Sequence, residues 1–326
     1  MKISFNNGTG LLPTGYGYAN FKLMTNLTKL GYSVMTNKIP ANVEINFIQP
    51  HHYQFFDDKS LKIGYTPWES TMLPTNEGDW IEPMLGCDEI WAPNQFTKNV
   101  FEDHGIKDVK VFHHGIDDTF SPRGRSLNYK LRFLHVGHPA LRKGLTETVE
   151  AFLDLFAGNN DVELVIKGYK NSDKHYPLPE ACYTEPNIKV ILSNLNYTEM
   201  ADLYASCHVM LYPSWGEGFG LMPLQAMATG MPAIFTSGWA DYQYLADDLA
   251  IKSELSMHPW QETHPGMMFK PDMTDFKEKI MMVYNNPQQY LSEFEIKSHE
   301  IHRDWSWSTK VDKFFTEFTE RNHLSK

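Results

Sequence analysis

Short apolar runs alternate with longer stretches of helical period along the chain. Residues 145–156 place Leu145, Val149, Phe152 and Phe156 at offsets 0, 4, 7 and 11, on one face of a helix. The runs that predict strands are residues 2–5, 33–36, 45–48, 62–66, 89–92 and 109–112, then 131–136, 162–167, 189–192, 209–212 and 233–235. This alternation is typical of βαβ units around a parallel sheet, and it predicts an α/β fold.

A polar stretch, SPRGRSLNYK at residues 121–130, separates the first series of strands and helices from a second one. Its proline, glycine and basic residues are typical of a linker, so we expect one domain at residues 1–123 and another at residues 124–304. The last segment, residues 305–326, carries apolar residues along one stripe of a helix and charges elsewhere. We therefore expect that helix to pack against another part of the chain.

Length and composition agree with this division. A chain of 326 residues with 42% apolar and 21% charged residues fits two globular domains. The 29 Lys and Arg residues against 40 Asp and Glu residues give a net charge of −11. A surface of that charge does not attract nucleic acid or anionic lipid as a whole, so any polyanion must meet a local basic patch.

Cysteine spacing and hydropathy bear on the compartment. Cys87, Cys182 and Cys207 lie far apart without a Cys-x-x-Cys spacing, which predicts neither a zinc site nor a disulfide framework. The first residues carry no apolar segment of a secretion signal, and no window approaches 18 consecutive apolar residues. We expect a cytoplasmic protein without stable membrane insertion.

The densest cluster of candidate functional residues is PSWGEGFGLMPLQAMATGMP at residues 213–232, directly after a predicted strand. A helix that begins near Leu221 directs its free N–H groups into the Gly-rich loop before it, where a phosphate can bind. Glu217 and Gln225 offer a carboxylate and an amide, which suit sugar hydroxyls. The same glycines also fit a turn that only packs closely.

These residues carry a resemblance to a known family. GEGFGLMPLQAMATGMPAI resembles the Glu-x7-Glu signature of the retaining glycosyltransferases of family 4, which have the GT-B architecture of two facing Rossmann-like domains. Further similar segments follow in the expected order: the loop from Pro13 to Gly17, DEIWAPNQFTKNVFEDHGI, HHGID, VGHPALRKGL and DWSWSTKVDKFF. The resemblance implies two parallel sheets with a cleft between them, and a C-terminal helix at residues 305–326 that packs back on the first domain.

The resemblance also implies roles in binding a donor. Glu217 would contact the transferred sugar, and Gln225 stands where the family has a second Glu that holds the ribose hydroxyls. This amide is a departure, because it lacks the charge that strengthens such hydrogen bonds. The backbone amides of Phe219, Gly220 and Leu221 would lie near the donor phosphates or sugar.

VGHPALRKGL places two cations at the end of a strand. Arg142 and Lys143 precede Gly144 at the start of a helix, where they can neutralise a leaving diphosphate. His138 stands where relatives often carry an Arg, and Arg142 is expected to take over its work. The alternative interpretation is a solvated basic helix start.

Other candidates follow from the resemblance with less specific motifs. Gly15 and Gly17 lie in the loop after the first strand and would face the donor phosphate or the acceptor, although an ordinary turn has the same pattern. Trp68 and Glu69 follow another strand and offer a sugar platform beside a carboxylate, with a capping role for Glu69 as the alternative.

His114 and Asp241 complete the set of weaker candidates for acceptor or sugar contact. His114 lies in the HHGID segment, and Asp241 lies in SGWADYQYL, where a structural capping role is the alternative. The chain has neither an HExxH nor a DxD motif, so we expect no metal site and no cofactor.

The resulting hypothesis is a retaining hexosyltransferase-type enzyme that needs no metal. It would move a sugar from a nucleotide-diphosphate sugar, with UDP or GDP as the nucleotide, to an acceptor hydroxyl. Glycan, lipid-linked glycan, protein and modified nucleic-acid base remain open as acceptors. Two alternatives remain: a non-catalytic sugar-nucleotide-binding subunit, and a glycosyl phosphorylase or nucleotide-sugar hydrolase on the same fold.

Overall fold

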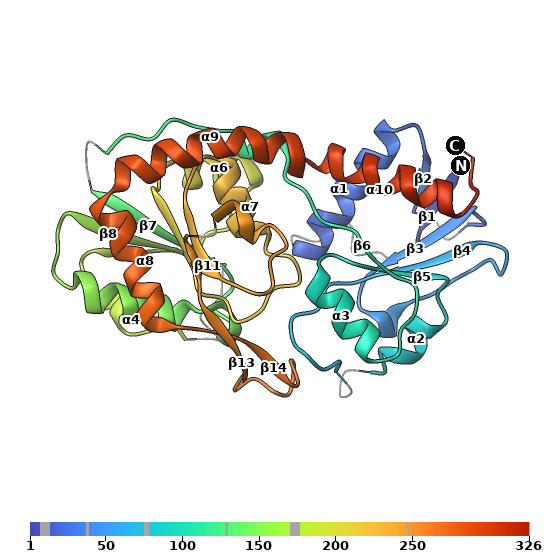
Figure 1. Ribbon diagram of the computed structural model, residues 1–326, viewed down its shortest axis with the longest axis horizontal. Coiled ribbons are helices and arrows are strands. Elements are labelled where there is room, and N and C mark those ends of the chain that lie inside the picture. Colours follow the sequence, from blue (N-terminus) through green and yellow to red (C-terminus); the bar gives the residue numbers. More distant parts are fainter. Residues whose placement is uncertain are drawn as a thin grey trace. The chain divides into compact units, whose positions relative to one another are not determined.

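The computed structural model describes residues 1–6, 14–36, 39–74, 78–127, 130–169, 177–246 and 248–325. Contacts divide the chain into two compact units, each with its own sheet (Figure 1). Unit 1 comprises Met1–Gly115, Gln261–Gly266 and Asp304–Lys326, and unit 2 comprises Ile116–Trp260 and Met267–Arg303.

Unit 1 contains a six-stranded parallel sheet in the order β2-β1-β3-β4-β5-β6. The strands are β1 (Lys2–Phe5), β2 (Ser33–Met35), β3 (Val43–Phe47), β4 (Leu61–Tyr65), β5 (Glu89–Ala92) and β6 (Val109–Val111), and the helices are α1 (Gly15–Lys29), α2 (Ile81–Leu85), α3 (Gln95–Asp103) and α10 (Trp307–Arg321). Polar caps fix where the helices begin. Thr14 accepts a hydrogen bond from the amide of Gly17 at α1, and Asn94 accepts one from Thr97 at α3.

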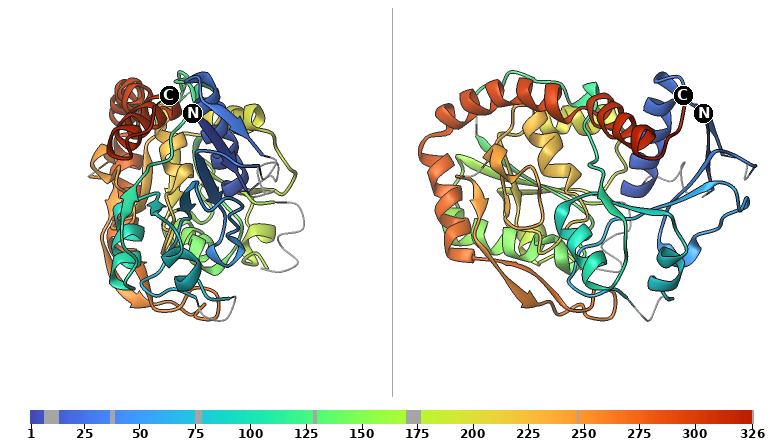
Figure 2. Two further views of the ribbon diagram at one scale, coloured as in Figure 1. Left: turned by 90° about the vertical axis from the view of Figure 1, so that its right-hand side faces the viewer. Right: turned by 45° about the vertical axis from the view of Figure 1, so that its right-hand side comes forward.

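Helix α10 lies beside α1 and completes the core of unit 1 (Figures 1 and 2). Trp91 of β5 meets Phe315 and Phe318 edge-on, and Phe112 stacks on Phe314 at 4.3 Å. Arg321 donates two 2.8 Å hydrogen bonds to the buried carboxylate of Glu89. The apolar stripe predicted at residues 305–326 is therefore the face that this helix buries.

Unit 2 contains a second six-stranded parallel sheet, in the order β12-β11-β10-β7-β8-β9. Its strands are β7 (Leu131–Val136), β8 (Val162–Lys167), β9 (Ile188–Ile191), β10 (Val209–Tyr212), β11 (Ala233–Thr236) and β12 (Ala250–Ile251). Its helices are α4 (Leu145–Phe156), α5 (Ala181–Thr184), α6 (Tyr197–Ala205), α7 (Leu221–Ala228), α8 (Met273–Asn285) and α9 (Pro287–Trp305), whose last two residues belong to unit 1.

The strand order reverses between β7 and β10. From β7 the chain proceeds to β8 and β9 on one side, and from β10 to β11 and β12 on the other. Because parallel crossovers are right-handed, the helices after β7 and after β10 lie on opposite faces. Figure 1 shows α4 on one face, and α6 and α7 on the other. Ligands of open parallel sheets bind at such a reversal, at the carboxyl ends of the strands.

An antiparallel hairpin, β13 (Ser253–Met257) and β14 (Met267–Pro271), follows β12 and is absent from the sequence-based prediction. The side chain of Gln261 bonds both the amide and the carbonyl of Gly266 at 2.9 Å, which closes the turn at residues 261–266. That turn belongs to unit 1, although both strands of the hairpin belong to unit 2.

The predicted α/β fold with two Rossmann-like parallel sheets is confirmed. Contacts divide the chain between Gly115 and Ile116, whereas the linker pattern predicted residues 123 and 124. The polar stretch is bound to unit 2: the guanidinium of Arg125 donates to the carbonyls of Cys207 at 2.8 Å and Thr229 at 2.6 Å. A polar segment that hydrogen-bonds to its own unit can have the same composition as a free linker, so composition alone does not distinguish the two.

Candidate functional site

The carboxyl ends of β7 and β10 approach each other closely at Gly144. A Cβ atom at this position would lie 2.2 Å from the carbonyl oxygen of Pro213, and its φ of +71° is one that glycine adopts without strain. Glycine therefore allows the 3₁₀ turn Leu141–Lys143 to lie against the loop after β10. The reversal of strand order coincides with this contact.

Backbone hydrogen bonds hold the two loops together. The amide of Trp215 donates to the carbonyl of Arg142 at 2.8 Å, and the guanidinium of Arg142 donates to the carbonyl of Gly216 at 2.7 Å. The hydroxyl oxygen of Ser214 lies 3.1 Å from the same Arg142 carbonyl. Both the backbone and the side chain of Arg142 are thus engaged with the loop that carries Glu217.

Glu217 is buried at the centre of this arrangement, with 6% of its surface exposed. The ammonium of Lys143 lies 2.7 Å from each of its carboxylate oxygens, and Arg142 Nη1 lies 3.3 Å from Oε1. Two hydroxyls also donate to Oε1, from Ser214 at 2.6 Å and from Tyr212 at 2.9 Å. The structure brings the three predicted catalytic residues into one hydrogen-bonded group.

The charge state of Glu217 follows from these contacts. Burial alone would raise the pKa of the carboxyl, but the charges of Lys143 and then Arg142 outweigh it and hold the pKa below its usual range. The carboxylate is therefore ionised at neutral pH and acts as an acceptor. Lys143 and Arg142 carry two positive charges against the single negative charge of Glu217, so the group can bind a second anion.

Helix α7 begins directly after this loop. Gly220 is its N-cap with φ of +84°, and a Cβ atom there would lie 2.2 Å from the ring of Trp239 and 2.6 Å from the hydroxyl of Tyr242. Tyr242 also donates a hydrogen bond to the carbonyl of Gly220, and Trp239 donates one to the carbonyl of Ser214 at 3.2 Å. The segment after β11 thus fixes both ends of the loop.

The predicted donor-binding residues of this loop are placed as follows. Phe219 is buried and packs edge-on against Tyr242, and Leu221 is the first residue of α7. Gln225 lies one turn further along α7 and is 4% exposed. The ring of His138, after β7, lies nearly parallel to that of Tyr169 at 6.5 Å. Asp241 precedes Tyr242 and is partly exposed.

Two of the residues predicted to contact the sugar or the acceptor, Trp68 and Glu69, follow β4 in unit 1. Trp68 is 5% exposed, donates to the carbonyl of Met72 at 2.9 Å and stacks against His264 at 5.2 Å. His264 Nε2 lies 3.3 Å from a carboxylate oxygen of Glu69. One face of the indole is therefore covered by the turn at residues 261–266, so Trp68 can offer a sugar little surface unless that turn moves.

The remaining predicted residues lie elsewhere in unit 1. His114 is buried between Trp307, which it stacks on at 5.5 Å, and the rings of Phe47 and Tyr65. Gly15 begins α1 and is exposed, whereas the amide of Gly17 donates to the hydroxyl of Thr14 at 3.0 Å in the helix cap. Pro13 lies outside the described residues.

Sequence reasoning missed three groups that shape the site. Ser214 and Tyr212 hydrogen-bond to Glu217, and their hydroxyls in the segment LYPSWGE were an available signal. The contact between His264 and Trp68 joins residues far apart in the chain, and no local pattern predicts it.

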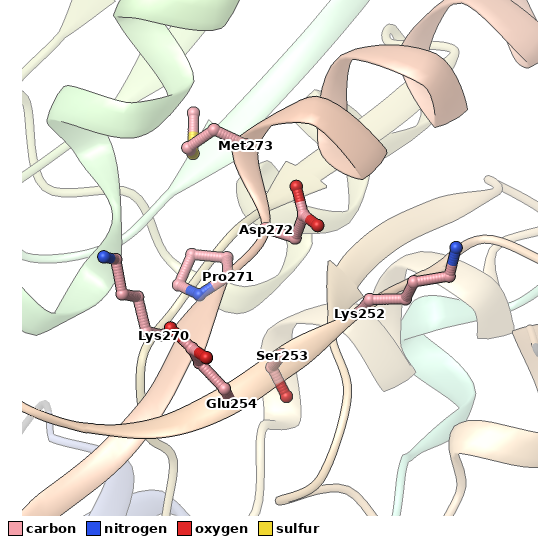
Figure 3. Close-up of a pocket in the computed structure, with 7 residues that line it drawn as sticks. All are labelled: Lys252, Ser253, Glu254, Lys270, Pro271, Asp272 and Met273. Atoms are coloured by element: carbon pink, nitrogen blue, oxygen red, sulfur yellow. The ribbon is translucent and has the colours of Figure 1, made fainter.

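A pocket of about 490 Å³ lies at the base of the hairpin, lined by residues 252–254 and 270–273. Figure 3 shows the side chains of Lys252 and Lys270 extending in different directions, so their charges do not converge on one ligand. None of the predicted site residues lines this pocket. Of its two carboxylates, that of Asp272 caps the N-terminus of α8 and accepts from the amides of Thr274 and Asp275.

Neither a metal-binding cluster nor a membrane-spanning helix occurs in the described part of the chain. It contains no group of three or more His, Cys, Asp or Glu side chains that could hold a metal ion. Over the same residues, no helix combines the length and the apolar character that crossing a bilayer requires.

Residues 118–248, which include Arg142, Lys143 and Glu217, match the family model described as glycosyl transferases group 1. The chain is 29% identical over 175 residues to a GDP-mannose-dependent alpha-mannosyltransferase of Corynebacterium glutamicum (50% of this chain, 39% of the relative). It is 32% identical over 111 residues to a serotype-specific mannosyltransferase of Escherichia coli (31% of this chain, 13% of the relative). The chain thus spans less than two thirds of the length of these relatives.

Solved structures share the fold of the whole chain. A sucrose-phosphate synthase from Thermosynechococcus elongatus superposes with a TM-score of 0.69 at 12% identity, covering 100% of both chains. The Anabaena protein HepE in complex with UDP and glucose superposes with a TM-score of 0.70 at 14% identity, covering 98% of this chain and 100% of that one. These structures share the α/β fold of this chain, and residues 118–248 are similar to the glycosyl transferases group 1.

Proposed function

We propose that the chain is a hexosyltransferase that transfers a sugar from a nucleotide-diphosphate sugar to an acceptor hydroxyl, with retention of anomeric configuration and without a metal ion. The observation that carries this proposal is the contact of Lys143 and Arg142 with Glu217 at the reversal of strand order in unit 2. The match of this segment to group 1 glycosyl transferases supports it.

Arg142 and Lys143 would bind the donor diphosphate. Two fixed cations stabilise the negative charge that develops on the leaving group, and the first N–H groups of α7 add a positive dipole end on the same loop. Side-chain cations can supply the neutralisation that a divalent ion supplies in other enzymes, which is why we propose a reaction without metal.

Glu217 would hold the transferred sugar. Its lowered pKa keeps the carboxylate ionised, so it can accept hydrogen bonds from sugar hydroxyls but has no proton to donate. When the diphosphate binds Lys143 and Arg142, those cations become shared between two anions. The oxygens of Glu217 then accept less from the two cations, and they can accept hydrogen bonds from the hydroxyls of the sugar instead.

The chemistry that we propose needs no protein nucleophile. The bond between the anomeric carbon and the diphosphate oxygen breaks, and the bond to the acceptor oxygen forms on the same face. The acceptor proton passes to an oxygen of the leaving diphosphate. Entry and departure on one face retain the configuration.

For the sugar and the acceptor we propose a chemical class. Two relatives are named as mannosyltransferases, one of them GDP-mannose-dependent, so GDP-mannose is the first donor to test. We assign acceptor binding to unit 1, where Glu69 is the candidate and Trp68 joins it only if the turn at residues 261–266 moves, whereas His114 is buried among aromatic rings and does not reach an acceptor. Glycan, lipid-linked glycan, protein and modified nucleic-acid base are the acceptor classes.

A thermal-shift panel tests the donor site directly. UDP-, GDP-, ADP- and TDP-sugars are added to the wild-type protein and to Glu217→Ala, with nucleotide release measured in the same wells. A ligand at 100 times its dissociation constant adds about 2.7 kcal/mol of stability. We expect one donor to stabilise the wild type and to release nucleotide slowly, with release abolished in Glu217→Ala.

Four further outcomes bear on the proposal. Binding of no sugar nucleotide would overturn it. An inverted product anomer, or transfer lost in EDTA and restored by a divalent ion, would overturn retention or metal independence respectively. Binding without turnover, even with acceptor extracts, would favour a non-catalytic sugar-nucleotide-binding subunit, which Gln225 and His138 favour because they replace charged residues of the related motif.

A further inference from the structure

Lys167, the last residue of β8, is a buried cation that has no counter-charge among the residues that the structure describes. Its side chain lies within the protein, with 2% of the residue exposed. The ammonium donates to the carbonyl of Gly168 and lies 4.8 Å from the centre of the Tyr169 ring. No carboxylate among the described residues lies within ion-pair distance of it. An ammonium buried in this way is costly unless another acceptor reaches it.

Two other lysines of unit 2, the partly buried Lys143 and the buried Lys279, show the contrast. Lys143 lies 2.7 Å from Glu217, and Lys279 pairs with Asp275 at 3.7 Å and donates to the carbonyl of Asp248 at 2.8 Å. Each has a partner that compensates its charge. Lys167 has a neutral carbonyl and the face of an aromatic ring, and burial lowers its pKa. In the described part of the chain, the carbonyl of Gly168 is the acceptor that the ammonium of Lys167 reaches.

The position of Lys167 links it to the site around Glu217. β8 is the neighbour of β7, and the carbonyl of Lys167 accepts a 3.0 Å hydrogen bond from the amide of Gly137. Gly137 in turn lies against the side chain of Lys143. Strands β10, β7 and β8 are adjacent, so the ends that carry Glu217, Lys143 and Lys167 span two strand spacings, about 10 Å.

Lys167 also lies on the face of the sheet that α7 covers. His135 of β7 contacts Thr148 of α4 at 3.0 Å, so its neighbour Val136 points to the opposite face. Lys167 pairs in register with Val136 and therefore shares that face. Figure 1 places α6 and α7 there. The ammonium and the N-terminus of α7 thus lie on one side of the sheet.

Aromatic rings accompany the cation. Tyr169 is 38% exposed, and its ring lies within 26° of parallel to that of His138. The diphosphate already has Arg142 and Lys143 one strand away. The part of the donor that is left for Lys167 and the two rings is the nucleobase, which is flat and aromatic and carries hydrogen-bond acceptors on its edge.

We propose that Lys167 binds the edge of the donor's nucleobase and selects guanine. Guanine presents two adjacent acceptors, O6 and N7, and lysine pairs with both. Uracil presents one carbonyl at the corresponding edge. Adenine places its N6 amino group, a donor, beside N7, and that amino group repels an ammonium. This inference rests on the proposed function, because it assumes that unit 2 binds a nucleotide.

Calorimetric titration of GDP, UDP, ADP and pyrophosphate tests the assignment. We compare the full-length wild-type protein with Lys167→Met, which keeps the aliphatic stem and removes the charge. Lys189→Met is the matched control, because this lysine lies on the next strand with an exposed side chain that pairs with Glu163. We expect the wild type to bind GDP most tightly, and Lys167→Met to weaken GDP about 10- to 100-fold with much smaller effects on the other probes. Lys189→Met should bind as the wild type does.

Each other outcome has a defined meaning. Equal weakening of all four probes, pyrophosphate included, would show that Lys167 contacts phosphate and would overturn the base assignment. Unchanged GDP affinity in Lys167→Met, or a wild-type preference for UDP or ADP, would overturn it too. Failure of the wild type to bind any nucleotide would overturn the proposed function itself.

Thermal unfolding without ligand provides a second readout. Because Lys167→Met removes an uncompensated buried charge, we expect its melting temperature to equal or exceed that of the wild type. A fall of several degrees would show that the ammonium has a structural partner, and would overturn the argument from its missing counter-charge.

Discussion

The ammonium of Lys143 lies 2.7 Å from both carboxylate oxygens of Glu217, so the two residues neutralise each other inside unit 2. An incoming diphosphate must therefore compete with a carboxylate that is already in place. Before the diphosphate binds, the carboxylate of Glu217 holds the cations in position. The affinity for the diphosphate then depends on which groups donate hydrogen bonds to Glu217 once Lys143 is shared.

Replacing Glu217 with Gln should separate charge from shape. The amide keeps the volume but no longer compensates Lys143 and Arg142, so we expect diphosphate to bind more tightly and sugar transfer to fall by at least about 100-fold. Titration with free nucleoside diphosphate and a transfer assay measure the two effects. Undiminished transfer would contradict the role of Glu217.

Breaking the pair from the other side should cost stability. In Lys143→Met the buried carboxylate keeps Arg142, Ser214 and Tyr212 but loses its nearest cation, so we expect a loss of about 3 kcal/mol in the free energy of unfolding. Chemical denaturation measures it. The double variant Lys143→Met/Glu217→Gln removes both charges and should recover most of this loss while remaining inactive. A double variant as unstable as the single one would contradict the pairing.

Gly220 offers a test of the loop geometry with a matched control. Gly220→Ala places a Cβ atom against Trp239 and Tyr242, whereas Gly158→Ala, at φ of +71°, meets nothing within 4 Å. Both carry the cost of positive φ, about 1 kcal/mol. We expect Gly158→Ala to lose about that much, and Gly220→Ala to lose several times more together with nucleotide binding. Equal losses of stability in the two variants would show that the side chains of Trp239 and Tyr242 move aside at little cost.

Buried histidines should make the protein sensitive to acid. Burial lowers the pKa of His114 to about 3, from an ordinary value near 6.5, and that of His135 to about 4. As the pH falls below about 6.5, the unfolded chain binds protons that the folded protein does not, so each histidine removes about 1.4 kcal/mol of stability per pH unit. This loss continues to about pH 4 for His135 and to about pH 3 for His114.

The variant His114→Phe checks this dependence. Phenylalanine suits a site formed by Phe47, Tyr65 and Trp307, and it has no proton to bind. We expect stability measured by denaturation between pH 6 and pH 4 to fall less steeply than in the wild type, by about one proton. An unchanged slope would show that His114 does not contribute.

Much of the second sheet follows directly from the sequence. The predicted runs 131–136 and 162–167 coincide with β7 and β8, because strands buried on both faces form nearly continuous apolar runs. The hairpin at β13 and β14 was missed. β13 is largely polar and exposed, and the apolar run of β14 is only three residues long, Met267–Phe269, so neither strand has a pattern like that of β7 or β8.

The group around Glu217 was predicted because its three charged residues lie in two motifs that each follow a strand. The hydroxyls that complete it, and the rings of Trp239 and Tyr242 that hold the loop, depend on packing between segments. Lys167 escaped notice for a related reason. Its sequence context, VIKG, is that of an ordinary strand end, and Lys167 is distinguished by its burial without a carboxylate partner in the ranges that the structure describes.

Unit 1 is assembled from three separate stretches of chain, and the last of them ends the sequence. During synthesis on the ribosome, Trp91 and Phe112 therefore emerge long before Phe314, Phe315 and Phe318, the rings that cover them. Unit 2 can complete its sheet while residues 1–115 still expose an apolar surface. Residues 1–115 are therefore translated before unit 2 but complete their core after it.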